Sequence, residues 1–302
     1  MTLDNDIAGS GPTLVLLHST VCDRRMWDPQ WRALVSAGYR VVRCDFRGYG
    51  GTPATMAPHS DADDVLALLD GIGADRVTLI GASHGGRVAL EVAARVPHRV
   101  AALALLCSGP PPGPRLSPEL AAFDDAEDVF FEQEDIKGAT ELNARFWLGP
   151  EATEATREFV REMQYHAFEL QLAAERESMR EGTVGEDGPQ DPPEPATGLG
   201  SGDDGTQDGT GDGTGDSADD GTDDGNEFDF DALTAVTAPA LVLTGAHDVP
   251  DFRATAERLA VLLPGARHEE LPWAGHLPGL ERPEEITHRL LEFLDEAGEL
   301  AR

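Results

Sequence analysis

The sequence predicts an α/β protein in which helices cover both faces of a mostly parallel sheet. Short apolar runs typical of strands alternate with segments of helical apolar spacing along residues 13–110 and again along 235–295. Between these two parts, residues 115–181 carry helical spacing and no strand pattern. With 302 residues, 40% of them hydrophobic, the chain is long enough to bury one large core with an inserted subdomain.

The first part of the alternating pattern predicts four strands and three helices. Asp28 and Pro29 are typical of a helix start, Gly38 of a helix end, and Ser60 of a helix cap. We expect strands at 13–17, 39–44, 77–80 and 100–106, and helices at 28–37, at 60–69 and after residue 83.

The second part continues the same pattern after the helical segment. We expect strands at 240–244 and 268–271, and helices at 252–263 and 283–294, the last with Pro283 in its first turn. The predicted organisation is a core of residues 1–110 and 228–302, interrupted by a helical segment at 115–181 and an acidic insertion at 182–227.

The segment 182–227 has a composition of its own. It contains 14 acidic residues, no basic residue and repeated Asp-Gly-Thr. Because such a segment cannot bury a core, we predict a disordered, solvated insertion. Asp216 to Glu227 matches part of a calcium-binding EF-hand loop, with acidic residues at the first, fifth and last places and Gly221 at the sixth. Since Ala218 occupies a ligand position and no flanking helices are predicted, we expect no metal site there.

The formal net charge of −33 limits the partners of this chain. It arises from 56 acidic and 23 basic residues. Such a charge repels phosphate backbones and anionic lipids, so we expect neither nucleic acid nor a membrane surface as partner. Self-repulsion also destabilises the compact state unless salt screens it, and we therefore predict a halophilic protein.

Cysteine usage and the first residues indicate a compartment. Cys22, Cys44 and Cys107 are too few and too scattered for a disulfide framework or a zinc site, so we expect reduced thiols. The opening MTLDNDIAGSGP carries neither the basic segment nor the apolar run of a signal peptide, and no run reaches membrane-spanning length. A cytoplasmic location is the prediction.

One turn carries the strongest chemical signal in the chain. The strand at 77–80 runs into Gly81-Ala82-Ser83-His84-Gly85, and a helical pattern follows. A G-x-S-x-G context between strand and helix places Ser83 on a sharp, strained turn that exposes its hydroxyl. The glycines let strand and helix pass closely, and the helix N-terminus favours an anion beside the serine. A Gly/Ser-rich turn without a catalytic role is the alternative interpretation.

A serine hydroxyl needs a histidine base, oriented by a carboxylate, to act as a nucleophile near neutral pH. Asp248 follows the strand expected at 240–244, and His276 follows the strand expected at 268–271. Because the carboxyl ends of parallel strands share one edge of the sheet, we expect Ser83, Asp248 and His276 to converge as catalytic residues. Asp251 is the alternative acid, although helix capping accounts for it.

Consecutive motifs of the chain resemble one protein family. LVLLHST, DFRGYGGTP, GASHGG, LVLTGAHD and GHLPGLERPEEI are similar to landmarks of the serine-nucleophile branch of the α/β-hydrolase superfamily. Residues 22–30 also resemble the 3-oxoadipate enol-lactonase group and its esterase relatives. The resemblance implies the α/β-hydrolase fold, with the helical segment at 115–181 as a cap over the active site.

The resemblance also implies an activity. The expected protein is a serine hydrolase that cleaves a small-molecule carboxylic ester or lactone through an acyl-enzyme, with no metal and no organic cofactor. Its oxyanion donors map to the backbone N–H groups of His84 and Thr20, and Ser19 stands where the family usually has glycine. Serine at position 83 argues against dehalogenases and epoxide hydrolases, which carry aspartate there, and against dienelactone hydrolases, which carry cysteine.

Several alternatives to ester or lactone cleavage remain open. On the same scaffold they are a C–C bond hydrolase, a cofactor-free perhydrolase or haloperoxidase, and a lyase. A non-catalytic binding module that keeps the fold is the alternative from a different class. A further one gives the acidic insertion the main role, as a docking or ion-binding segment.

The remaining polar and aromatic candidates receive structural interpretations. His18 is expected to hold its loop rather than act as a base, and Asp45 and Arg47 are expected to form a salt bridge. Arg24 and Arg25 are interpreted as surface ion-pair partners, with attraction of a substrate carboxylate as the alternative. Packing within the helical segment is expected of Trp147, Met163 and Phe168.

Overall fold

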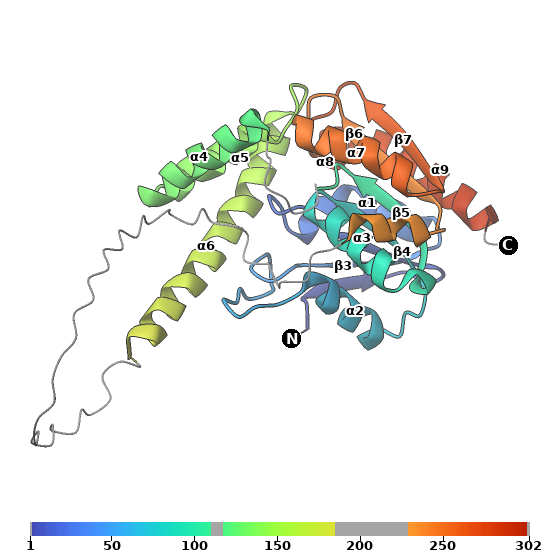
Figure 1. Ribbon diagram of the computed structural model, residues 1–302, viewed down its shortest axis with the longest axis horizontal. Coiled ribbons are helices and arrows are strands. Elements are labelled where there is room, and N and C mark those ends of the chain that lie inside the picture. Colours follow the sequence, from blue (N-terminus) through green and yellow to red (C-terminus); the bar gives the residue numbers. More distant parts are fainter. Residues whose placement is uncertain (1, 110–116, 185–228, 301–302) are drawn as a thin grey trace, which may run out of the picture.

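The computed structural model describes residues 2–109, 117–184 and 229–300 (Figure 1). Within these ranges the strands form one seven-stranded sheet of order β1-β3-β2-β4-β5-β6-β7. Strand β1 is antiparallel to β3, and every other neighbouring pair is parallel. The strand bounds are β1 Asn5–Ala8, β2 Thr13–Leu17, β3 Arg40–Cys44, β4 Val77–Ala82, β5 Val100–Leu106, β6 Ala240–Gly245 and β7 Ala266–Leu271.

The helices alternate with the strands, as the sequence predicts. Their bounds are α1 Asp28–Ser36, α2 Asp61–Gly71, α3 His84–Arg95, α4 Pro118–Glu132, α5 Ile136–Phe146, α6 Glu154–Val184, α7 Pro250–Leu262, α8 Pro278–Glu281 and α9 Pro283–Leu300. The described residues also form three short 3-10 helices, η1 Arg24–Trp27, η2 Pro97–Arg99 and η3 Phe230–Ala235. The predicted α/β class, with a mostly parallel sheet and helices on both faces, is confirmed.

Alternation along β2 shows how the sheet is covered on both faces. Leu14 and Leu16 point into one apolar cluster, which also contains residues of α1 and α9. Val15 and Leu17 point into the opposite cluster, with residues of α2, α3 and α7. Because successive side chains of a strand point to opposite faces, a continuous apolar run such as TLVLL requires cover on both sides.

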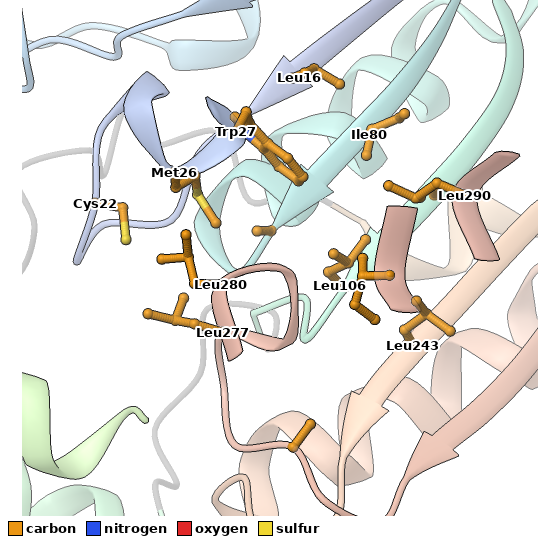
Figure 2. Close-up of a cluster of buried hydrophobic side chains, with 14 of the residues drawn as sticks. Leu16, Cys22, Met26, Trp27, Ile80, Leu106, Leu243, Leu277, Leu280 and Leu290 are labelled. Carbon is orange, nitrogen blue, oxygen red and sulfur yellow. The ribbon is translucent and has the colours of Figure 1, made fainter. Parts of the chain in front are cut away.

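The first cluster extends to the carboxyl edge of the sheet (Figure 2). There Leu277 and Leu280 pack in the same group as Met26 and Trp27, and each of the four is almost fully buried. Leu277 follows directly on His276. Burial of this neighbour fixes the segment after β7 against the rigid core, so the histidine stands on an anchored loop.

An inserted helical segment separates β5 from β6 in the chain. Helices α4, α5 and α6 form it, and Figure 1 shows them beyond one end of the sheet. Ser117 caps α4 by accepting a hydrogen bond of 3.2 Å from the Leu120 N–H. Helix α6 continues to Val184, three residues beyond the predicted bound at 181. The rest of the acidic insertion, with the EF-hand-like stretch, lies outside the described residues.

Two short elements differ from the prediction. Strand β1 was not expected, since NDIA has no apolar run. An edge strand with a single neighbour does not need a continuous apolar run. Asp6 of β1 instead forms an ion pair with Arg43 of β3, at 3.0 Å. Helix α8 was not predicted either, because one turn is too short to show a helical period. Among the described helices, none combines the length and the apolar character needed to cross a bilayer.

Candidate active site

Ser83 stands on a strained turn between β4 and α3. Its backbone adopts φ 52° and ψ −117°, a conformation that costs a non-glycine residue about 1–3 kcal/mol. Hydrogen bonds hold the turn from both sides, because the Ser83 N–H donates to Leu106 O at 2.9 Å and the Gly109 N–H donates to Ser83 O at 3.1 Å. The rigid sheet therefore maintains the strain and fixes the direction of the hydroxyl.

Two glycines make this turn sterically possible. A Cβ at Gly81 would lie 2.3 Å from Gly85 O, and a Cβ at Gly85 would lie 2.4 Å from Leu17 O. Both distances are far below contact, and the atoms met are backbone atoms that have little room to move. The elbow is thus built by close approach of β4, α3 and the end of β2.

Asp248 and His276 meet at the carboxyl edge of the sheet, after β6 and β7. The His276 Nδ1 lies 2.9 Å from Asp248 Oδ2, and both residues are buried. Asp248 Oδ1 accepts a second hydrogen bond, from the Val249 N–H at 2.8 Å. An ionised Asp248 can only accept hydrogen bonds, so this contact places the proton of neutral His276 on Nδ1 and leaves Nε2 as the basic nitrogen.

Ser83 lies at the same edge, at the end of β4. Strand β5 lies between β4 and β6, and hydrogen bonds join its end to both neighbours. The Ser83 N–H, after β4, donates to Leu106 O, and the Cys107 N–H donates to Leu243 O of β6 at 2.8 Å. Asp251, the alternative acid, points elsewhere: its Oδ1 accepts a hydrogen bond of 2.9 Å from the Ser117 N–H. It joins α7 to the start of α4 and does not cap its own helix.

The loop that carries His276 is held by Glu281, for which the sequence predicted no role, and by Trp147, which was expected only to pack within the helical segment. Both oxygens of Glu281 lie 3.1 Å from the Gly275 nitrogen, whose N–H they accept. Burial raises the pKa of Glu281, and N–H groups of Gly275 and Gly149 oppose this rise. The His276 N–H donates to Trp147 O at 2.8 Å. The inserted helices thus help to position the candidate base.

Aromatic rings enclose the imidazole. The Trp147 ring centroid lies 4.6 Å from that of His276, and the Phe252 centroid lies 4.3 Å from it. Met163 and Phe168 are buried in the helical segment, as predicted. The prediction for Trp147 was incomplete, since its ring packs with Phe123 and also against His276. Water has little access to the base from this side.

The two candidate oxyanion donors, the N–H groups of His84 and Thr20, lie on two segments that a hydrogen bond joins. His84 is the first residue of α3, directly after Ser83, so its N–H belongs to the helix N-terminus. The Gly85 N–H donates to His18 O at 3.0 Å and ties the end of β2 to this helix. No acceptor for the Thr20 N–H is found in the described part of the chain. Ser19 has no positive φ, so glycine is not required at that position.

His18 holds this loop, as predicted. It is fully buried, its Nδ1 lies 2.8 Å from Ser19 O, and its Nε2 accepts from the Phe46 N–H at 2.9 Å. The proton is therefore on Nδ1, and both ring nitrogens are occupied. Burial lowers the pKa of His18, so the neutral form that this bonding requires is favoured.

The side chain of His84 forms a buried pair behind the elbow. Its Nε2 lies 2.7 Å from Asp61 Oδ2, at the start of α2. Burial alone would raise the pKa of Asp61, but the hydrogen bond from His84 and the electrostatic influence of His84, His59 and His18 together lower that pKa below its ordinary value. The first residue of α3 is thereby fastened to a second helix.

The two arginines for which attraction of a substrate carboxylate was the alternative interpretation both form ion pairs. Arg24 contacts Asp45 at 2.8 Å, and Arg25 contacts Asp23 at 2.8 Å. They line a cavity of about 490 Å³ that lies between helix α6 and the loops after β2 and β3, and Ser83 is not among its lining residues. The predicted bridge between Asp45 and Arg47 was wrong. Arg47 pairs with Asp64 at 2.5 Å, because α2 faces it.

A third titratable side chain lies beside Asp248 and His276. Cys107 follows β5, has φ 47°, and is fully buried. Its Sγ, a carboxylate oxygen of Asp248 and a ring nitrogen of His276 all lie within 4.8 Å of one another. Burial and the neighbouring Asp248 raise the pKa of this thiol well above its ordinary value. Within the described residues, this is the one group of three side chains whose chemistry suits a metal ion.

Comparison with known proteins identifies a matching protein family and a set of related proteins. A family model described as alpha/beta hydrolase fold matches residues 12–283. A curated relative, a putative carbamate hydrolase RutD of Variovorax paradoxus, is 37% identical over 112 residues, which cover 35% of this chain and 42% of the relative. The match thus spans less than half of the relative's own length.

Solved structures resemble the whole chain. An esterase from Thermogutta terrifontis is 23% identical, with a TM-score of 0.70 over 98% of this chain and 93% of its own. An enol-lactonase from Burkholderia xenovorans LB400 is 24% identical, with a TM-score of 0.70 over 97% of this chain and 96% of its own. At these identities the likeness concerns the fold.

Proposed function

The chain belongs to the α/β-hydrolase fold family, and we propose that it is a serine hydrolase that cleaves a carboxylic ester or a lactone through an acyl-enzyme. The observation that carries this proposal is the hydrogen bond of 2.9 Å between His276 Nδ1 and Asp248. It lies at the edge of the sheet where the strained Ser83 ends β4. The pair supplies the oriented base that a serine nucleophile requires.

In the proposed mechanism, Nε2 of His276 takes the proton of the Ser83 hydroxyl as its oxygen attacks the carbonyl carbon. Asp248 accepts from Nδ1–H and stabilises the imidazolium that forms. His276 then protonates the leaving alcohol oxygen, and the acyl group remains on Ser83. Water repeats the same sequence and releases the acid. For a lactone, the leaving alcohol stays attached to the acyl group until hydrolysis.

The carbonyl oxygen becomes an oxyanion during each attack, and we propose the N–H groups of His84 and Thr20 as its donors. The position of His84 at the N-terminus of α3 supports the first, because a helix N-terminus favours negative charge. The bond between the Gly85 N–H and His18 O supports the second, since it keeps the Thr20 loop beside the elbow. Loss of one such donor reduces turnover about a hundredfold or more.

The class of substrate is part of the proposal. Phe252 and Trp147 present apolar rings around His276, and such a lining suits an uncharged ester or lactone better than an ionic substrate. The solved structures of similar fold include proteins named as an esterase and an enol-lactonase. The leaving group is then an alcohol, which His276 protonates in the proposed mechanism.

A fluorophosphonate probe tests the nucleophile directly. We expect one label per chain, on the peptide that contains Ser83, in wild type and in Ser36→Ala, a control at an exposed serine of α1. Ser83→Ala should take up no label. An unlabelled, folded wild type that also fails to hydrolyse p-nitrophenyl esters of graded chain length and small lactones would favour a non-catalytic binding module.

Two further proposals concern the environment of the enzyme. The net charge of −33 supports a protein whose stability rises with salt, and a melting temperature no higher in molar KCl than in dilute buffer would exclude this. The three cysteines are buried and unpaired, which supports a reducing, cytoplasmic compartment. The proposed partner is a small-molecule ester or lactone.

A further inference from the structure

We propose that Cys107, Asp248 and His276 form a binding site for a thiophilic divalent metal ion such as Zn²⁺, and that occupation of this site switches the enzyme off. The ligand atoms of the three side chains lie within 4.8 Å of one another. A thiolate, a carboxylate and an imidazole are a typical ligand set for zinc.

The topology of the sheet brings the three ligands together. Cys107 follows β5, Asp248 follows β6 and His276 follows β7, and these strands are parallel neighbours. The left-handed backbone of Cys107, with φ 47°, ends β5 abruptly at this edge. All three ligands therefore stand on the rigid end of the sheet, and the Cys107 N–H is bonded to Leu243 O of β6.

The spacing requires only a small adjustment. In tetrahedral zinc sites with these donors, ligand atoms lie about 3.4–3.6 Å apart. The present set is within 4.8 Å, so the thiol must move inward by about 1 Å. The pair of His276 Nδ1 and Asp248 Oδ2, at 2.9 Å, must open slightly. The proposed site requires a rotation of the Cys107 side chain and a small shift of the imidazole.

The charges also balance. A buried ion is tolerated only where its charge is compensated, and all three residues are buried. Zn²⁺ displaces the proton of the Cys107 thiol, which leaves for solvent. The thiolate and the Asp248 carboxylate then neutralise the two positive charges, while the imidazole binds as a neutral ligand.

Metal binding is expected to inhibit hydrolysis because the metal occupies a ring nitrogen of His276. Nδ1 of His276 is the ring nitrogen that faces Asp248, so it is the one assigned to the metal, and the remaining ring proton must then sit on Nε2. That nitrogen is the one that accepts the Ser83 proton in the proposed mechanism. This consequence rests on the proposed function, whereas binding of the metal does not. Inhibition should therefore be reversible by a chelator.

Metal binding is measured first, without reference to activity. The probes are Co²⁺, for its thiolate charge-transfer absorption, and Zn²⁺ in equilibrium dialysis of metal-free protein. We expect wild type to show the absorption band and to bind one tight Zn²⁺ per chain. Cys107→Ser and Cys107→Ala should lose the band and bind Zn²⁺ at least tenfold more weakly. Cys44→Ser, which removes another fully buried thiol, should behave as wild type.

Inhibition is measured second, with each variant normalised to its own metal-free rate. Zn²⁺ should inhibit wild type and Cys44→Ser, EDTA should restore the rate, and Mg²⁺, which prefers oxygen ligands, should have no effect. Equal Zn²⁺ affinity in wild type and both Cys107 variants, or an unchanged cobalt band, overturns the site. A metal-bound protein without ester hydrolysis instead refutes the proposed function and leaves the site intact.

Discussion

The close approach at Gly85 makes a sharp prediction. In Gly85→Ala the new Cβ would lie 2.4 Å from Leu17 O and 2.6 Å from His18 O. Real Cβ atoms essentially never come within 3.0 Å of another heavy atom, so the backbone carbonyls must retreat by about 0.5 Å. The same movement strains the 3.0 Å bond from the Gly85 N–H to His18 O.

These terms set the size of the effect. Overpacking costs about 1–3 kcal/mol, and a lost backbone hydrogen bond costs about 1 kcal/mol. The sum, about 2–4 kcal/mol, lowers the melting temperature of a chain of this length by about 3–6 °C. The loop of Thr20 moves with His18. Because a misplacement of about 1 Å at a catalytic centre costs about a hundredfold in rate, we expect this smaller displacement to reduce turnover about tenfold.

The assay combines thermal unfolding with the rate of fluorophosphonate labelling. Gly71→Ala is the matched control, since the Cβ there meets nothing within 4 Å and the residue has no positive φ. We expect this control to label at the wild-type rate and to be slightly more stable, because alanine restricts the unfolded chain. If Gly85→Ala labels within threefold of wild type at an unchanged melting temperature, the proposed dependence of the site on this contact is wrong.

Three further predictions test other parts of the site. Asp248→Asn should keep the fold, by circular dichroism, and lower kcat about 10³–10⁴-fold, because the imidazole loses its orienting anion; a loss below tenfold would contradict the role given to Asp248. Against the opposing effect of burial, the hydrogen bond from His84 and the electrostatic influence of nearby histidines lower the pKa of Asp61, so the stabilisation is present above the ordinary carboxyl pKa of 3.8 and is lost as pH falls below it. Denaturant unfolding of Asp61→Asn should therefore show a shallower loss of stability in acid than wild type, and equal slopes would refute this. Trp147→Phe should retain packing against His276 while Trp147→Ala lowers kcat/KM and the melting temperature, with about 3–5 kcal/mol lost to the cavity; equal kcat/KM in both variants would show that the ring does not support the base.

Much of the fold could be predicted because its signals are local. The strand at 100–106 was predicted with the bounds that β5 has, and Ser60 caps α2 as expected. The apolar run of a doubly covered strand and the hydroxyl of a cap are properties of a few adjacent residues. The signal for the strained turn at Ser83 is equally local, since the flanking glycines of the G-x-S-x-G motif predict it.

Contacts between distant segments were harder to predict. The bond from the His276 N–H to Trp147 O joins the loop after β7 to the end of α5, and both groups are backbone atoms with no side-chain signature. Arg47 was assigned to Asp45 because the two are close in the chain, yet tertiary packing gives it Asp64. Charge alone cannot choose among many acidic partners in a chain of net charge −33.

The inserted helical segment contributes contacts to the candidate site. Glu281 accepts from the N–H of Gly275, just before His276, and Gly149 packs against both Glu281 and Gly275. Since Gly149 and Trp147 belong to the insertion, the loop of the base is fixed from outside the sheet as well as from within it. The elbow of Ser83, in contrast, is held by parts of the sheet and its first flanking helix, namely β4, β5, the end of β2 and α3. The candidate nucleophile and the candidate base are therefore positioned by different parts of the chain. We expect a substitution in the insertion to change activity by displacing His276 rather than Ser83.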